Sequence, residues 1–196
     1  MNGATLPLSH GPLRRLACRA LVLPLMLAAA AGRAQAAGSG ASVLERRVKA
    51  AFLYKFLGYT EFPPHAFADA ATPVTLGVIG SDEMAVELAR IVAGRNAGGR
   101  ALMVRALGEG DVAGTVHLLF VAGEGPRIGR ALRAVPGALL TVTEAENGLQ
   151  HGSIINFRIV DERVRFDVSL DAAERNNVKL SSRLLSVANS VQKGAA

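Results

Sequence analysis

The sequence predicts an α/β fold, a single domain with a mixed β-sheet of about six strands and helices on both faces. Short apolar runs alternate with segments of helical spacing, which is typical of strands and helices packed in layers. Near the C-terminus, two alternating runs flank Asp161-Glu162, which indicates an antiparallel hairpin. The chain has 196 residues and is 50% hydrophobic, enough for one domain with a sizeable core.

Residues 1–36 have the order of a secretory signal peptide. This stretch contains four arginines and no acid. Three of the arginines precede an uncharged apolar run at 20–31, and Ala34-Gln35-Ala36 forms a small-residue cleavage site. The run is short for a membrane span. We expect cleavage near Ala36 and export, with residues 37–42 as a flexible tether and 43–196 as the folded domain. An uncleaved N-terminal anchor is the alternative.

Removal of the signal peptide changes the charge and cysteine content. The whole sequence has 22 basic and 16 acidic residues, and losing four arginines leaves 18 against 16, a net charge of about +2. No basic run interleaved with aromatic residues occurs, so the sequence lacks the pattern of a nucleic-acid-binding surface. Cys18 leaves with the signal peptide, which excludes a disulfide framework and thiolate chemistry in the remainder.

The segment that follows the tether predicts an amphipathic helix that ends before Pro63-Pro64. Ser42 and Glu45 have the spacing of a capping box at its start. Apolar residues recur on one face at three- and four-residue spacings, namely Leu44, Val48, Ala51, Phe52, Phe56 and Tyr59.

The remaining elements follow from periodicity and from turn residues. We expect strands at 74–80, 102–107, 115–122 and 137–144, with the hairpin at 153–160 and 163–170. Helices are expected after Ser81 to residue 93, at 125–135, at 171–177 and at 181–191.

A glycine-rich turn resembles a dinucleotide-binding loop in its order of elements. A strand precedes Gly123, Gly125 and Gly129, and Glu144 ends the next strand. Glu124 would repel a phosphate, however, and Pro126 removes a donor N–H at the helix start. An ordinary turn followed by a helix is therefore the favoured interpretation.

No cofactor, metal site or catalytic constellation is expected. The three histidines beyond the signal peptide, His65, His117 and His151, are not at metal-ligand spacing. Ser181 and Ser182 follow Lys179, but neither a GxSxG elbow nor a Ser-x-x-Lys motif surrounds them.

The segment around Lys179 leaves two interpretations open. A serine directly before a helical run is typical of an N-cap. Lys179, Ser181, Ser182 and Arg183 could also bind a small anionic ligand at the helix start. We therefore treat these four residues as ligand-binding candidates.

The two ends of the domain resemble the YfiR-like (DUF4154) periplasmic proteins. The resemblance lies in "VKAAFLYKFLGYTEFP" and in "GSIINFRIVDERVRFDVSLDAAERNNVKLSSRLLSVA", and it covers about Val48 to Val191. Phe62-Pro63 stands where the family often has Trp-Pro. Asn176-Asn177 stands where it commonly has Gly-Gly or Ala-Gly.

The resemblance implies a non-enzymatic regulator that is located in the periplasm after cleavage of the signal peptide. Proteins of this kind repress an inner-membrane diguanylate cyclase by binding its periplasmic sensor region, which lowers cyclic di-GMP and biofilm formation. A homodimer is a further expectation from the family, whereas disulfide-based redox control does not carry over because the domain has no cysteine. We take the exposed positions at the first helix and its exit as partner-binding candidates: Tyr54, Lys55, Tyr59, Glu61 and Phe62.

Two other functions remain open from the sequence. One is an exported small-ligand sensor that serves a different membrane receptor. The other is an exported α/β hydrolase that uses Ser181 or the glycine-rich turn.

Overall fold

The computed structural model describes residues 1, 22–108, 111, 116–134 and 140–194, with side chains from residue 40 onward. The chain divides into two compact units, Met1–Val43 and Leu44–Ala196. The predicted signal peptide, residues 1–36, lies mostly outside the described residues. The second unit contains every strand that the structure describes and is the α/β domain.

The first helix, α1 (Val22–Leu57), is longer than the sequence predicted. The expected start at Ser42 is wrong, because Ser42 is an interior residue of the helix and not its N-cap. The physical reason is the alanine-rich sequence before it, since alanine has the highest helix propensity. The expected end is close to the observed one, because α1 stops at Leu57, shortly before Pro63.

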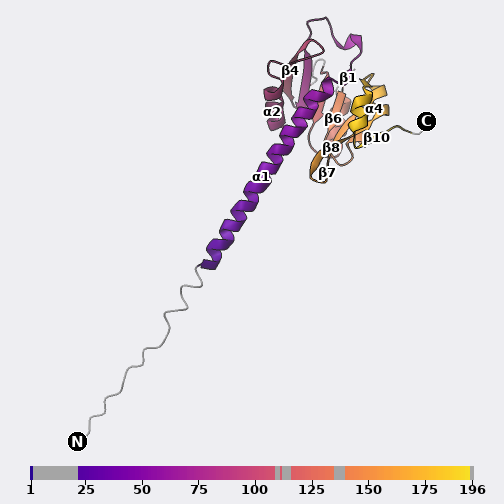
Figure 1. Cartoon of the computed structure of the whole chain (residues 1–196). Coiled ribbons are helices and arrows are strands. Elements are labelled where there is room, and N and C mark those ends of the chain that lie inside the picture. Colours follow the sequence, from indigo (N-terminus) through magenta and orange to yellow (C-terminus); the bar gives the residue numbers. More distant parts are fainter. Residues whose placement is uncertain (2–21, 109–110, 112–115, 135–139, 195–196) are drawn as a thin grey trace. The chain divides into compact units, whose positions relative to one another are not determined.

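The main sheet confirms the predicted α/β class (Figure 1). Its eight strands lie in the order β10-β8-β7-β6-β5-β2-β4-β3, and it is mixed, because the β7–β8 and β3–β4 pairs are antiparallel whereas its other pairs are parallel. The strands are β2 (Val74–Ile79), β3 (Asn96–Ala97), β4 (Arg100–Leu107), β5 (Leu118–Val121), β6 (Leu140–Thr143), β7 (Ile155–Val160), β8 (Arg163–Ser169) and β10 (Ser190–Gln192).

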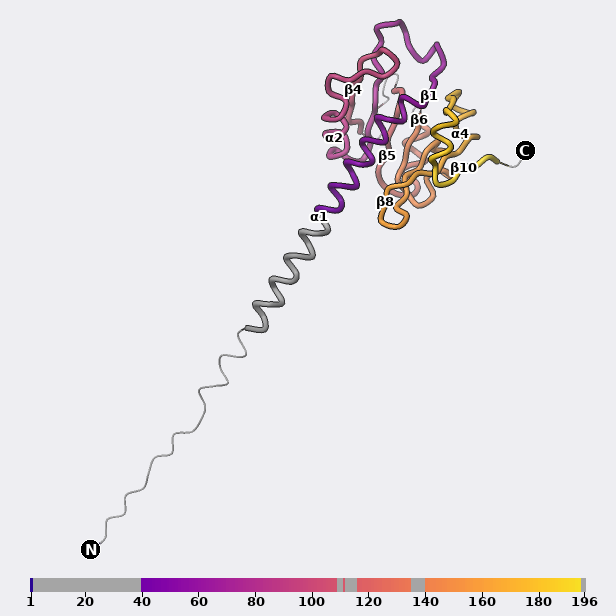
Figure 2. The backbone as a smooth tube through the Cα atoms, viewed as in Figure 1, coloured from indigo at the N-terminus to yellow at the C-terminus, as the bar shows by residue number. Residues whose placement is uncertain are grey.

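A second, two-stranded sheet joins β1 (Thr60–Glu61) to β9 (Lys179–Leu180). These strands were not predicted, because two residues are too few to show a period. They bring the exit of α1 beside the C-terminal part of the chain, which Figure 2 shows as purple and yellow tubes in the same region. The remaining helices are α2 (Asp82–Val92), α3 (Pro126–Ala134), α4 (Leu170–Arg175) and α5 (Ser182–Val187), with 3-10 turns η1 (Pro64–Ala66) and η2 (Gly148–His151).

The last predicted helix is wrong in its second half. The sequence favoured a helix over 181–191, whereas α5 ends at Val187 and Ala188 is extended. The reason is a long-range pairing, because the Asn189 N–H donates to the Phe166 carbonyl over 2.8 Å. This bond starts β10, which runs parallel to β8 along the edge of the sheet.

Helices cover both faces of the sheet, as expected. Alternate residues of β5 point to opposite faces, so that Phe120 belongs to the larger core and Leu119 to the smaller one. The larger core also contains buried residues of α1 and α2, and the smaller one contains Ile128 of α3.

Five phenylalanines form the centre of the larger core. The Phe56 ring lies 5.0 Å from that of Phe166 and 5.8 Å from that of Phe157, while Phe52 and Phe120 extend the group. Through these rings the last turns of α1 pack against the β7–β8 hairpin, which is far away in the sequence.

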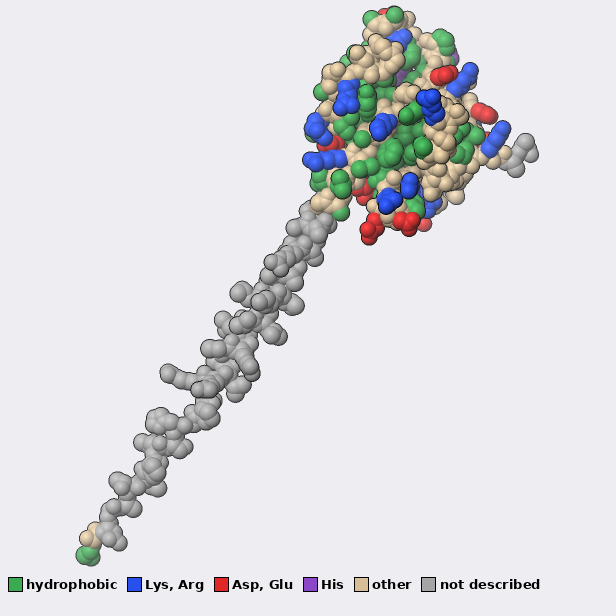
Figure 3. Space-filling view, viewed as in Figure 1, with side chains coloured by type: hydrophobic (Ala, Val, Ile, Leu, Met, Phe, Trp, Pro, Cys, Tyr) green, Lys and Arg blue, Asp and Glu red, His purple; other side chains and the backbone are tan. Residues whose placement is uncertain are grey.

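The described surface shows mixed character. On the face in Figure 3, Lys and Arg side chains are scattered among hydrophobic ones and do not form one continuous patch. Among the residues that the structure describes, no helix is long and apolar enough to cross a membrane.

We predict that Phe56→Ala destabilises the domain by about 3–5 kcal/mol, because it removes a buried aromatic ring and leaves a cavity. Phe56 is 1% exposed. Urea unfolding, followed by circular dichroism, measures this change. Tyr59→Ala is the matched control, since Tyr59 is 40% exposed. Equal losses of stability in the two variants would contradict the proposed role of Phe56.

Candidate functional site

The small β1–β9 sheet brings together the two sets of candidate residues. Glu61 lies opposite Lys179, and Thr60 lies opposite Leu180. The pairing extends one residue further, because the Ser181 N–H donates to the Tyr59 carbonyl over 2.9 Å. Partner candidates from the exit of α1 therefore lie beside ligand candidates from the C-terminal segment.

Strand alternation gives this small sheet an inner and an outer side. Thr60 and Leu180 are half-buried, and Leu180 packs against the larger core. Because successive side chains of a strand point to opposite sides, Glu61 and Lys179 share the other side, and Tyr59 and Ser181, which the backbone hydrogen bond joins, flank that pair. We call these four residues the ribbon face. Tyr59, Glu61 and Lys179 are exposed on it, whereas Ser181 is half-buried.

Hydrogen bonds at the end of α1 position this segment. The Gly58 N–H donates to the Lys55 carbonyl, and the Tyr59 N–H donates to the Phe56 carbonyl, each over 3.0 Å. The Thr60 hydroxyl donates to the same Phe56 carbonyl over 2.8 Å. These bonds satisfy carbonyls that a helix end leaves free, and they turn the chain toward β9.

Ser181 is the N-cap of α5, which was one of the two interpretations left open. Its Oγ accepts a hydrogen bond from the Leu184 N–H over 3.3 Å. Among the described residues, no hydrogen bond joins Ser181 or Ser182 to a histidine or a carboxylate. The role of Ser181 as a helix cap therefore accounts for a serine at this position, and no catalytic role is needed to explain it. Ser182 and Arg183 are exposed.

The remaining partner candidates differ in how accessible they are. Lys55 is exposed on the last turn of α1. Tyr54 is half-buried, and the Arg95 guanidinium lies 5.1 Å from its ring centroid. Phe62 is also half-buried and packs against the larger core, so most of its side chain is not available to a partner.

Phe62 contacts an aromatic stack that the sequence analysis missed. The Phe67 ring lies parallel to the His117 ring at 4.4 Å, and the Arg100 guanidinium lies 3.9 Å from the Phe67 centroid. Phe62 meets His117 edge-on at 5.8 Å. Arg100 also donates to the carbonyls of Asp69, Ala70 and Thr72, which holds that loop in place.

Buried His117 is held in its neutral form. Its Nδ1 accepts from the Thr75 N–H over 3.0 Å, so the proton must lie on Nε2, which faces the Ala66 carbonyl at 3.0 Å. Burial lowers the pKa of His117, and the positive charge of Arg100 lowers it further, although the Ala66 carbonyl acts in the opposite direction. Protonation at Nδ1 would break the bond to Thr75.

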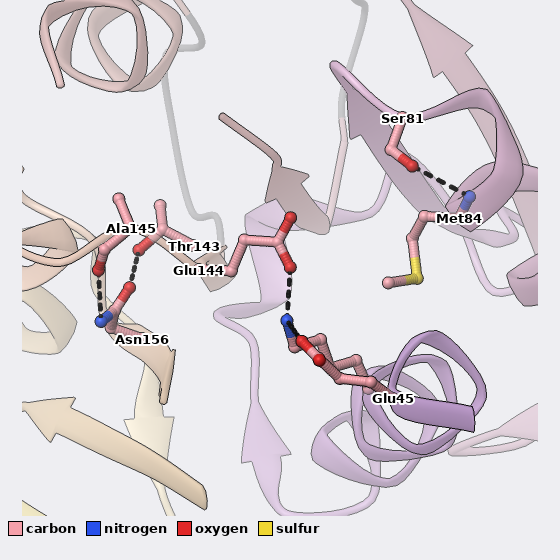
Figure 4. A network of polar contacts seen from close by, with 8 residues as sticks. Glu45, Ser81, Met84, Thr143, Glu144, Ala145 and Asn156 are labelled. Carbon is pink, nitrogen blue, oxygen red and sulfur yellow. Dashed lines mark hydrogen bonds and ion pairs between the residues drawn. The ribbon is translucent and has the colours of Figure 1, made fainter. Parts of the chain in front are cut away.

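The pair Lys49–Glu144 explains the acid at the end of β6. Lys49 is buried on α1, and its Nζ lies 2.7 Å from Glu144 and 2.5 Å from Glu45 (Figure 4). Burial alone would lower the pKa of Lys49, but the hydrogen bonds and charges of the two glutamates outweigh it and raise the pKa. Glu144 thus anchors α1 to the sheet and is occupied in a structural contact.

The glycine-rich turn also has a structural explanation. Gly123 and Gly125 have φ angles of 110° and 57°, which favour glycine, and Pro126 is the first residue of α3. Glu124 lines a cavity of about 390 Å³ at this turn, together with Glu146 and His151. The carboxylates there are unsuited to a phosphate. Across the described ranges, no group of three or more His, Cys, Asp or Glu residues could hold a metal ion.

We predict that acid destabilises the domain through His117. Below about pH 6.5, the ordinary pKa of histidine, the unfolded chain takes up a proton that the folded His117 disfavours, so the free energy of unfolding falls. The loss from this group is at most about 1.4 kcal/mol per pH unit and stops below the folded pKa. Urea unfolding between about pH 7.5 and 5 measures it. His117→Gln, which does not titrate, should show a shallower dependence, and identical slopes would refute the assignment.

Comparison with known proteins agrees with the sequence resemblance. The family model described as DUF4154, YfiR/HmsC-like, matches residues 46–189. One solved structure, a conserved domain protein from Vibrio cholerae O1 biovar El Tor, is 13% identical with a TM-score of 0.43; the match covers 60% of this chain and 54% of that one. No curated protein gives a significant match. The family match includes both the exit of α1 and the segment that forms β9 and α5, and the chain belongs to the YfiR/HmsC-like family.

Proposed function

We propose that this chain is an exported, non-enzymatic regulator that represses an inner-membrane diguanylate cyclase by binding its periplasmic sensor region. Lower cyclase activity reduces cyclic di-GMP and biofilm formation. Family membership supports a periplasmic regulator of this signalling system. In this proposal the signal peptide is cleaved near Ala36, and residues 37–42, which are helical as part of α1, link the cleavage site to the domain.

The observation that carries the proposal is the ribbon face. Two sequence motifs separated by more than a hundred residues meet there, and the strand pairing holds them in a fixed register. Tyr59, Glu61 and Lys179 present an aromatic ring and both signs of charge to the outside. Tyrosine is enriched in protein interfaces, and complementary charges set the orientation of a partner.

Repression then follows from differential binding. If the domain binds the inactive state of the cyclase sensor more tightly than the active state, binding shifts the population toward the inactive state. The size of the shift is limited by the ratio of the two affinities. The domain needs no chemistry of its own for this, which agrees with the structural role of Ser181 as a helix cap.

We predict that deleting the gene raises cellular cyclic di-GMP and that the full chain restores the low level. A chain without residues 1–36 should fail to restore it, because it would not reach the periplasm. Mass spectrometry of cell extracts measures the nucleotide. Unchanged cyclic di-GMP in the deletion strain, with the host's membrane cyclases expressed, would rule out the proposed function and favour a sensor for another receptor.

We predict that Lys179→Ala weakens repression severalfold without unfolding the domain. The side chain is exposed, so its removal should change the free energy of unfolding by no more than about 0.5 kcal/mol. Cyclic di-GMP level and protein abundance are measured in the same cells. Arg163→Ala, which removes an exposed positive charge from β8, is the matched control. Parallel loss of protein and repression would point instead to a structural role for Lys179.

A further inference from the structure

We propose a second binding site, for a small hydroxylated primary amine, in a polar cavity between the β7–β8 hairpin, η2 and β10. The cavity has a volume of about 120 Å³. It is distinct from the ribbon face, and the inference does not depend on the proposed function. Nearly all of its lining side chains are polar, and Leu149 is the one aliphatic side chain among them.

The anchor of the site is Asp167. Its side chain is only 6% exposed, and its Oδ1 accepts a hydrogen bond from the Asn189 amide over 2.7 Å. The other oxygen, Oδ2, lies 3.6 Å from the nearest Arg158 nitrogen, which is too far for a hydrogen bond. Within the described part of the chain, Oδ2 accepts no hydrogen bond.

A buried carboxylate normally has hydrogen bonds to both oxygens, because removing its charge from water is costly. No fully buried side-chain oxygen or nitrogen lacks a hydrogen-bond partner in the described residues. Because Asp167 Oδ2 accepts no hydrogen bond, it is not fully buried, and we infer that it is accessible from the cavity that Asp167 lines. A donor that enters this cavity would satisfy it.

The charge of the lining selects the ligand. Asp167 and Glu146 contribute two negative charges, and Arg158 contributes one positive charge that already faces Asp167. The excess is negative, which favours an ammonium group over a phosphate or a carboxylate. An ammonium group also supplies three donors, which suit the acceptors on Asp167 and Glu146.

The rest of the lining favours hydroxyl groups on the same ligand. Asn147, Gln150 and Gln192 are among the lining residues, and a side-chain amide both donates and accepts hydrogen bonds. Hydroxyl groups can meet both kinds of amide atom, whereas a bare hydrocarbon chain would leave them without partners. The site therefore fits a small amino alcohol better than an alkylamine.

Serinol and glycerol form a matched pair of probes, because serinol has an ammonium group where glycerol has its central hydroxyl. We expect isothermal titration of the purified protein to give a serinol Kd of about 1 mM or tighter, with glycerol at least about tenfold weaker. Equal binding of the two probes, or no binding of serinol up to about 10 mM, would overturn the proposal.

Variants test whether the binding occurs at Asp167. Asp167→Asn keeps an acceptor for Asn189 but loses the charge, and it should weaken serinol binding at least about tenfold. Glu174→Gln removes an exposed carboxylate outside the cavity and should leave the Kd unchanged. If Asp167→Asn fails to fold, Glu146→Gln decides, since Glu146 is exposed and its change should still weaken serinol severalfold. Undiminished binding in the folded variants would refute the site.

Discussion

The contact between Phe56 and the rings of Phe157 and Phe166 is the interaction on which the rest of the domain depends. It joins the last turns of α1 to a hairpin about a hundred residues later. The Phe56 carbonyl then accepts from both Tyr59 and Thr60, so the chain leaves the helix in a defined direction. One residue therefore contributes both to the core and to the position of the ribbon face.

The order of the strands explains why this contact also positions the C-terminal segment. The β7–β8 hairpin lies between the parallel strands and β10, so α1 packs on the part of the sheet from which the C-terminal segment departs. Lys49 adds a second attachment by reaching Glu144 at the end of β6. This buried lysine is tolerated because it is paired with both Glu144 and Glu45; without the two glutamates it would be a costly unpaired charge. The two attachments leave α1 little freedom to shift along the sheet.

Sequence patterns predicted the elements that have a period and missed those that depend on distant partners. The strands of the parallel sheet and the hairpin were predicted because apolar runs and alternation are local signals. β1, β3, β9 and β10 were not, since a strand of two or three residues exists only through its partner. The role of His117 was missed for the same reason: Thr75 and Ala66, which fix its tautomer, are 42 and 51 residues away. The capping role of Ser181 could be predicted from the sequence, because an N-cap residue lies directly before the helix that it caps.

The C-terminal segment connects the two proposed sites physically. Its start, Lys179 and Leu180, pairs with β1, and α5 follows directly. At the other end of α5, the Asn189 amide donates to Asp167, the anchor of the polar cavity. A ligand that changes the hydrogen bonds of Asp167 therefore acts on a segment only a few residues from the ribbon face. If the segment holds two arrangements, that ligand and a partner protein would each bias the same equilibrium, and their affinities would be coupled reciprocally. The regulator could then respond to a small molecule through a short stretch of its own chain, without rearrangement of the sheet.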